Sequence, residues 1–205
     1  MKLFFKLIAK TQNFLLGFSI LILMLLPQVI VFYPDFIFSY TTILFSLAHF
    51  SLFLVMIIRP LADLLPKLKF IRPLVILRKG MGVFSASIIV SFILAKLMID
   101  PSGYLSSFIT LSYWSTTNLA LFAHLADISA VLLLVTSNQL SKRLLQKNWK
   151  RVQRLSYVYF YASATYVIFI LHDTKVIWYS VIVTTLTLLA FFSKRRRRLT
   201  NIIPK

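Results

Sequence analysis

The chain has 205 residues, of which 59% are hydrophobic and 14% charged, and its mean hydropathy is +0.85. Soluble domains of this length carry more charged residues and fewer long apolar runs. The formal net charge is +18, but the basic residues lie between apolar runs, which favours topology signals and contacts with anionic lipid over nucleic-acid binding. The absence of cysteine excludes disulfides, thiol catalysis and cysteine-held iron–sulfur clusters. The few glycines form neither G-x-G-x-x-G nor a P-loop, so no nucleotide or flavin module is recognisable.

Six apolar runs have about the length that a membrane-spanning helix requires. They cover residues 14–32, 39–58, 80–99, 113–136, 155–171 and 176–192. The first is read as a retained helix, because no small-x-small cleavage site follows it. Between the second and third runs, basic residues, prolines and apolar patches predict a helix lying at the membrane interface around residues 61–72. The predicted fold is therefore an all-α polytopic bundle of six transmembrane helices, one domain over residues 1–198, with a short tail at 199–205.

The distribution of basic residues predicts the orientation of this bundle. Of the 23 Lys and Arg residues, 21 lie at the N-terminus, in the second-to-third and fourth-to-fifth connections, or in the C-terminal tail. Asp35, Asp100 and Asp173 fall on the opposite side. The positive-inside rule then places both termini in the cytoplasm and the chain in the inner membrane. Anionic headgroups are the expected partners of the basic connections.

Two histidines lie well inside predicted spans. His49 is about ten residues into the second helix from its outer end, and His124 about eleven into the fourth. At about 1.5 Å per residue both would lie near the membrane midplane. Two neutral imidazoles at matching depth could hold the iron of one b-type haem from opposite faces. The alternative is that each hydrogen-bonds a neighbouring group and binds no cofactor.

A carboxylate and a polar stripe accompany these histidines. Asp127 follows His124 by one helical turn, so it could orient a ligating imidazole, relay protons, or simply lock two helices together by a hydrogen bond. On the fifth span, Tyr159, Ser163 and Tyr166 share one face with Ser156, which we expect to turn toward the bundle interior. No Ser/His/Asp triad, zinc-ligand spacing or pair of catalytic carboxylates can be found.

Several short motifs resemble the ferric reductase-like transmembrane domain, and in particular its bacterial methionine sulfoxide reductase branch. Arg78-Lys79-Gly80-Met81-Gly82 opens one helix, a later helix ends in Thr136-Ser137-Asn138, and Asn148-Trp149-Lys150-Arg151-Val152-Gln153-Arg154-Leu155-Ser156-Tyr157 opens another. The resemblance covers about residues 44–192. It implies a membrane subunit that passes electrons through b-type haem, from quinol to a separate extracytoplasmic redox partner protein.

The family's haem histidines are absent from this sequence. Their positions fall at or next to Phe92, at Gln153 and at Tyr166. Either a haem is held differently, with His49 and His124 as the available ligands and Asp127 behind them, or the chain is a haem-free relative. The second reading predicts a membrane scaffold, an assembly factor or a small transporter built on the same bundle. A lipid-modifying enzyme using His124 and Asp127 is disfavoured, because polar substrates would lie far from the midplane.

Overall fold

The computed structural model describes residues 2–68, 70–115, 119–170 and 172–200, and within these residues it contains helices and no β-strand. This confirms the predicted all-α class. The long helices are α1 (Lys2–Phe32), α2 (Pro34–Leu64), α4 (Leu77–Ile99), α6 (Ala120–Val135), α8 (Leu155–Ile170) and α9 (Thr174–Thr200). The shorter elements are α3 (Ile71–Leu74), α5 (Pro101–Ser107), the 3₁₀ turn η1 (Leu111–Trp114) and α7 (Gln139–Val152).

The chain is a multi-pass helical membrane protein. Among the described residues, α1, α2, α9 and the continuous stretch from α3 through α4 are each long and apolar enough to cross a membrane. α6 and α7 meet at a bend of 116° and could form a fifth crossing. The 16-residue helices α6 and α8 would cover only about 24 Å at 1.5 Å per residue, against a hydrocarbon core of about 30 Å. Four to five candidate spans are therefore found, and six spans stay a prediction.

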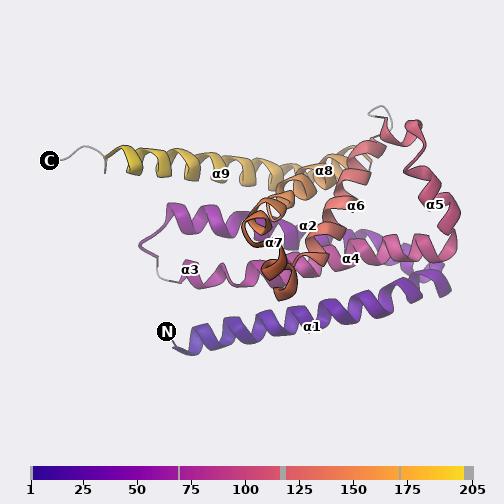
Figure 1. Cartoon of the computed structure of the whole chain (residues 1–205), viewed down its shortest axis with the longest axis horizontal. Helices are drawn as coiled ribbons and strands as arrows, with labels where there is room; N and C mark the ends of the chain where they lie inside the picture. The colour runs from indigo at the N-terminus through magenta and orange to yellow at the C-terminus, as the bar shows by residue number, and fades with distance from the viewer. Residues whose placement is uncertain (1, 69, 116–118, 171, 201–205) are drawn as a thin grey trace.

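Helix α4 is the centre of the bundle. It packs against α1, α2 and α6, and Figure 1 shows α1 along one side of α4, with α2 and α9 beyond its other side. The inner faces of α4 carry small residues, and Ser85, Ala86, Ser87 and Ser91 are at most 1% exposed. Such residues allow helix backbones to approach closely, which is the main source of helix association in lipid. The core also includes Phe160 of α8, which is 1% exposed.

Two predicted helix boundaries were wrong. Among the described residues of 61–72, no separate interfacial helix is found, because α2 continues through Pro60 to Leu64 and the next helix there is the four-residue α3. Spanning helices tolerate proline where neighbouring groups satisfy the freed backbone atoms. The predicted fourth span at 113–136 is also shorter, because Leu119, with a left-handed φ of 54°, precedes the start of α6 at Ala120. Residues 116–118 of that span, residue 171 of the fifth and residues 201–205 of the tail lie outside the described chain.

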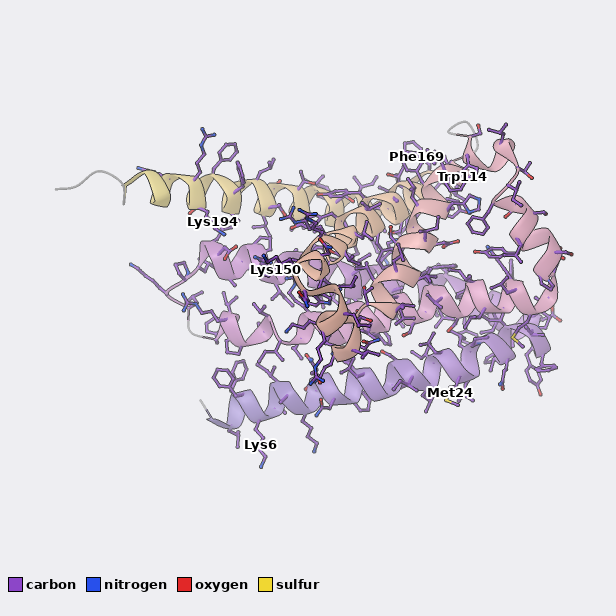
Figure 2. All side chains as sticks on the ribbon, viewed as in Figure 1. Lys6, Met24, Trp114, Lys150, Phe169 and Lys194 are labelled. Atoms are coloured by element: carbon purple, nitrogen blue, oxygen red, sulfur yellow. The ribbon has the colours of Figure 1, made fainter. Side chains whose placement is uncertain are left out.

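The two ends of the bundle differ in chemistry. α1 begins and α9 ends at the same end (Figure 1). Lys6, Lys150 and Lys194 lie in that half of the molecule, whereas Trp114 and Phe169 lie in the other (Figure 2). We call the half that contains these three lysines the basic end. Which side of the membrane it occupies stays a prediction from the positive-inside rule.

Candidate basic cavity

A large cavity lies at the basic end of the bundle, between α2, α4, α6, α7, α8 and α9. Its volume is about 1130 Å³. We call it the basic cavity. Its lining consists of Leu52, Val55, Arg59, Pro60, Asp63, Val75, Arg78, Lys79, Gly82, Val83, Leu133, Ser137, Asn138, Gln139, Lys142, Trp149, Lys150, Gln153, Arg154, Ser156, Tyr157, Tyr159, Thr187, Ala190, Phe191 and Lys194. The sequence segments that build it are far apart, and only the packing of the helices brings them together.

Positive charge dominates the outer part of this lining. Seven of the lining side chains are Lys or Arg, and Asp63 is the single carboxylate among them. The guanidinium of Arg78 is fixed to the neighbouring helix, because its Nε donates to the backbone carbonyl of Val55 at 2.9 Å. Among the described residues, none of these seven cations pairs with a carboxylate within 4 Å. Like charges held together without counter-charge favour an anion between them.

Helix α7 forms one wall of the cavity. The Trp149 indole N–H donates to the carbonyl of Thr136 at 3.1 Å, which ties α7 back to the end of α6. The Lys142 ammonium lies 5.5 Å from the centre of the Trp149 ring. Within α7, Gln146 has φ 43° and ψ −112°, so the helix is broken in its middle. Each half of α7 is attached to the end of α6 by its own contact, because Ser141 Oγ in the first half donates to the Val135 carbonyl at 3.0 Å and Trp149 lies in the second half.

Two buried donors in the lining lack hydrogen-bond partners. Gln153 Nε2 and Thr187 Oγ1 are both inaccessible to solvent and neither meets an acceptor. A buried polar group without a partner costs about 1–3 kcal/mol. Both atoms belong to residues that line the basic cavity. The two residues border the cavity, but the two atoms themselves are buried behind its surface.

The inner part of the cavity is apolar. Leu52 and Val55 of α2, Val83 of α4 and Leu133 of α6 contribute hydrocarbon to it. Its inner end reaches Tyr159, which is 2% exposed and shares a 3.1 Å hydrogen bond with Ser85 Oγ. A cavity with a cationic mouth and an apolar interior has the polarity of an anionic amphiphile.

His49 is buried in the core, at 4% exposure. Its Nδ1 donates to the backbone carbonyl of Phe45 at 3.0 Å, in the tautomer that protonates this nitrogen, and its Nε2 is buried with no hydrogen-bond partner. A ligating histidine is held in this way, with one nitrogen fixed by a carbonyl and the other available to a metal. The arrangement fits one haem ligand.

His124 lies in a different part of the fold. It is the fifth residue of α6 and so lies near the start of that helix, and its depth in the membrane stays a prediction. Its ring packs against Phe108 and Trp114, with ring centres 4.8 Å and 5.6 Å away. His49 lies on α2 and His124 on α6. Helices α4 and α8 connect these two helices, because each of them packs against both α2 and α6. No second imidazole is seen against His49 in the described chain, so the predicted pair of haem ligands stays a prediction.

Asp127 is half-buried on α6, and no hydrogen bond joins it to His124 among the described residues. On α8, Tyr159 and Ser163 are buried and Tyr166 is half-buried. Ser163 donates to the carbonyl of Phe160 within its own helix at 3.1 Å. The polar stripe therefore faces the interior mainly through Tyr159, which reaches the basic cavity.

The three positions at which the resemblance would place haem histidines have other surroundings. The ring of Phe92 stacks on Phe45 with centres 4.9 Å apart. Gln153 lines the basic cavity, and Tyr166 packs beside Ala164 and Val176. The sequence reading singled out Gln153 only as a missing histidine. It did not find the cavity, because charges that were interpreted as topology signals also line it.

The search for relatives gives this chain no family. No family model, no curated protein and no solved structure matches it. The resemblance to ferric reductase-like domains therefore stays a prediction. What the structure offers for function is the basic cavity and the buried imidazole of His49.

Proposed function

We propose that this chain is a membrane protein that binds an anionic amphiphile, one with a phosphate-bearing head and an apolar tail, in the basic cavity. The observation that carries the proposal is the convergence around one space of seven Lys and Arg side chains, none of which pairs with a carboxylate among the described residues. Phosphate oxygens accept from Arg, Lys and amide donors alike. Basic pockets between membrane helices are typical sites for phospholipid heads.

The shape of the lining supports an amphiphile rather than a free ion. The head would lie between Arg59, Arg78 and Lys150, and the tail would extend along Val83 and Leu133. Each contact with a Lys or Arg near the membrane surface contributes about 1 kcal/mol to binding an anionic lipid. An inorganic anion would use only the cationic mouth and leave the apolar interior unfilled. From the sequence, anionic lipid headgroups are expected to contact the basic connections in general. The proposal assigns such a headgroup to one site, the basic cavity.

Native mass spectrometry of the detergent-purified protein tests this proposal. We expect dioleoyl phosphatidylglycerol to stay bound under conditions that strip dioleoyl phosphatidylcholine. The double change Arg59→Gln and Arg78→Gln removes two fixed positive charges of the mouth and is expected to weaken phosphatidylglycerol binding by at least tenfold, at about 1 kcal/mol per contact. Arg143→Gln with Lys147→Gln is the matched control, because both residues are exposed on α7 and neither lines the cavity. Equal losses in the two double variants would reject the site.

A second variant tests the tail. A Cβ added at Gly82 would meet only Val55 Cγ2, at 3.9 Å, so a larger side chain can enter the cavity without a backbone clash. We expect Gly82→Leu to lower phosphatidylglycerol binding while the protein keeps its folded circular-dichroism spectrum. Gly82→Ala, which adds one methyl group, is expected to bind as the unchanged protein does. A Gly82→Leu protein that binds normally would place the tail elsewhere.

The second candidate function is the electron transfer that the resemblance implies, and it is favoured by the unpartnered Nε2 of His49. Haem would supply one-electron chemistry when bound, with a quinol donor and an extracytoplasmic acceptor. The test is an absorption spectrum of protein made with haem supplied, before and after dithionite. A stoichiometric Soret band that His49→Ala abolishes would support this function. Its absence would leave the haem-free alternative, a scaffold, assembly factor or transporter, which is compatible with amphiphile binding.

The side of the membrane is part of the same proposal. The basic connections favour a cytoplasmic basic end, with both termini there and the chain in the inner membrane. The cavity would then face the leaflet that carries more anionic lipid. Because the chain has no native cysteine, a single cysteine at Lys147 or at Asp100 can be labelled with a membrane-impermeant maleimide in whole cells. We expect labelling at Asp100 and none at Lys147 until the cells are opened.

A further inference from the structure

A smaller recess adjoins the basic cavity at the connection between α2 and α4. Its volume is about 440 Å³, and it is lined by Arg59, Ala62, Asp63, Pro66, Arg72, Val75 and Arg78. Four of these residues, Arg59, Asp63, Val75 and Arg78, also line the basic cavity. The two spaces therefore share a wall, and Arg72 of α3 lies on the recess side alone.

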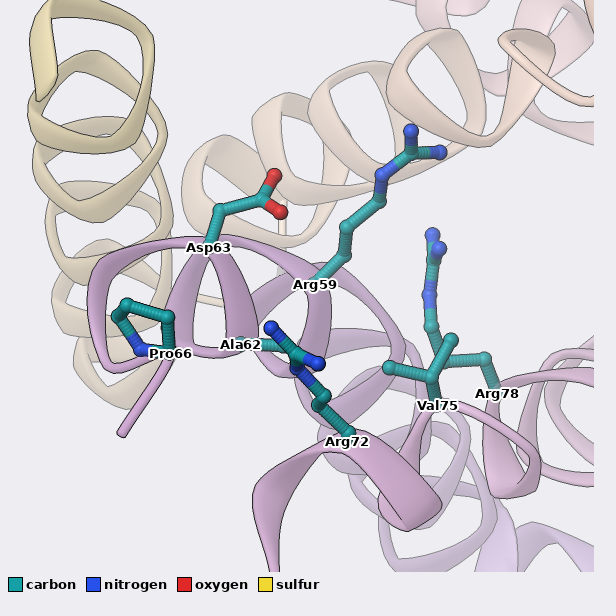
Figure 3. A pocket seen from close by; sticks show the side chains of 7 residues that line it. All are labelled: Arg59, Ala62, Asp63, Pro66, Arg72, Val75 and Arg78. Carbon is teal, nitrogen blue, oxygen red and sulfur yellow. The ribbon is translucent and has the colours of Figure 1, made fainter. Parts of the chain in front are cut away.

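The arginines of this recess come from three separate elements. Figure 3 shows Arg59 on α2, Arg72 on α3 and Arg78 on α4, with Asp63 also at the rim. Arg78 is oriented by its bond to the carbonyl of Val55. No ion pair joins Asp63 to any of the three arginines in the described parts of the chain. The Arg59 and Arg78 guanidinium groups are thus available to anionic groups in both spaces.

We infer that the amphiphile carries two phosphate groups, one held in the basic cavity and one in the recess, with Arg59 and Arg78 between them. This inference rests on the proposed function, because it concerns the head of the same ligand. Seven cations line the cavity and Arg72 is an eighth, against the single carboxylate of Asp63. One phosphodiester brings one negative charge and can occupy one space only. A two-phosphate head brings a charge for each space, and bidentate arginine contacts are suited to both.

Two ligand chemistries meet this description, and the experiment separates them. One is a glycerol-bridged pair of phosphodiesters, for which tetraoleoyl cardiolipin is the probe and dioleoyl phosphatidylglycerol its one-phosphate match. The other is a diphosphate on a single apolar chain, for which farnesyl diphosphate is the probe and farnesyl phosphate its match. Inorganic pyrophosphate, added as competitor, reports whether the head alone suffices. Native mass spectrometry of the full chain gives the dissociation constant of each probe.

We expect one two-phosphate probe to bind at least about tenfold more tightly than its one-phosphate match, since a hydrogen-bonded charged contact contributes about 1.5–3 kcal/mol. Pyrophosphate should displace it only weakly. Arg72→Gln should remove this preference while changing one-phosphate binding by less than about twofold, because Arg72 lines the recess alone. Lys150→Gln, in the basic cavity alone, should weaken both probes. Lys67→Gln, at an exposed residue of the same connection outside both spaces, is the control and should change neither.

The outcomes are distinguishable. If no phosphate-bearing amphiphile binds, the proposed function itself fails. If one- and two-phosphate probes bind equally, or if Arg72→Gln weakens both to the same degree, the two-phosphate head is rejected and the basic cavity stands as a site for a one-phosphate amphiphile. If pyrophosphate displaces the probes completely, the recess recognises a free anion and the inference is overturned.

Discussion

The contact between α1 and α4 makes a sharp prediction about Gly80. A Cβ built at this glycine would lie 3.2 Å from Leu15 Cβ and 3.4 Å from the Gln12 carbonyl oxygen. The 3.2 Å separation is shorter than ordinary van der Waals contact and the 3.4 Å separation is at its lower limit, and both atoms belong to the neighbouring helix α1. Gly80→Ala must therefore push α1 away from α4 or strain its own helix. Gly82, two residues later, has nothing closer than 3.9 Å.

The magnitude follows from comparing the two glycines. Replacing a helical glycine with alanine gains about 1 kcal/mol in helix propensity, and this gain applies equally to both sites. Overpacking costs about 1–3 kcal/mol and applies at Gly80 alone. We therefore expect Gly80→Ala to have a free energy of unfolding about 1–3 kcal/mol lower than that of Gly82→Ala. Gly82→Ala itself should be as stable as the original chain, or more stable.

Reversible unfolding in mixed micelles, by titration with SDS and far-UV circular dichroism, measures this difference. Gly17→Ala is a second control, because nothing lies within 4 Å of a Cβ at Gly17 on α1. A Gly80→Ala protein as stable as the Gly82→Ala protein would show that α1 does not approach α4 as closely as described. The central position of α4 in the bundle would then be wrong.

Three further predictions concern single hydrogen bonds. Tyr159→Phe removes the bond to Ser85 and should lower the free energy of unfolding by about 0.6 kcal/mol and no more than about 1.7; an unchanged SDS titration would mean that the two helices do not meet there. Trp149→Phe removes the bond to the Thr136 carbonyl and should speed tryptic cleavage within α7 about fivefold, at about 1 kcal/mol, whereas Trp178→Phe, at a 67% exposed indole, should not. The Gly103 N–H lowers the pKa of the Asp100 carboxyl, so the turn's extra stability is present above the unfolded-state pKa and disappears as pH falls through the folded-state pKa. Hydrogen exchange at the Gly103 amide should show this loss of protection on acidification. In the Asp100→Asn variant, which has no carboxyl group to protonate at this position, the protection of the Gly103 amide should not change with the protonation of residue 100.

Composition and apolar run length predicted the class of fold because lipid leaves a chain few choices. Backbone groups in hydrocarbon must be satisfied within the segment, so long apolar runs become helices. Helix boundaries were harder, since they depend on local geometry. Pro60 was read as the end of a helix, but α2 continues past it, and the left-handed Leu119 delays the start of α6.

The site was less accessible to sequence reasoning than the fold. The depth expected for His124 was counted from a predicted boundary at residue 113, whereas α6 begins at Ala120, so the position of this residue along its helix differs from the expected one. The basic cavity depends on which faces of six helices meet, and the periodicity of one helix does not report this. Lys and Arg residues in loops also orient a membrane protein in the bilayer. This role accounts for the basic connections by itself, so nothing in the sequence indicated that these residues line one cavity. Gln153 lies in the polar connection between α7 and α8, so its sequence surroundings gave no sign that it lines a cavity.

The most direct measurement of the central claim is photo-crosslinking in native membranes with a phosphatidylglycerol that carries a diazirine near the top of one acyl chain. Peptide mapping should find adducts concentrated at the apolar lining of the basic cavity, around Val83 and Leu133, and Arg59→Gln with Arg78→Gln should strongly reduce them. Adducts spread evenly over exposed faces such as Leu21 of α1, and unchanged in the double variant, would contradict the account.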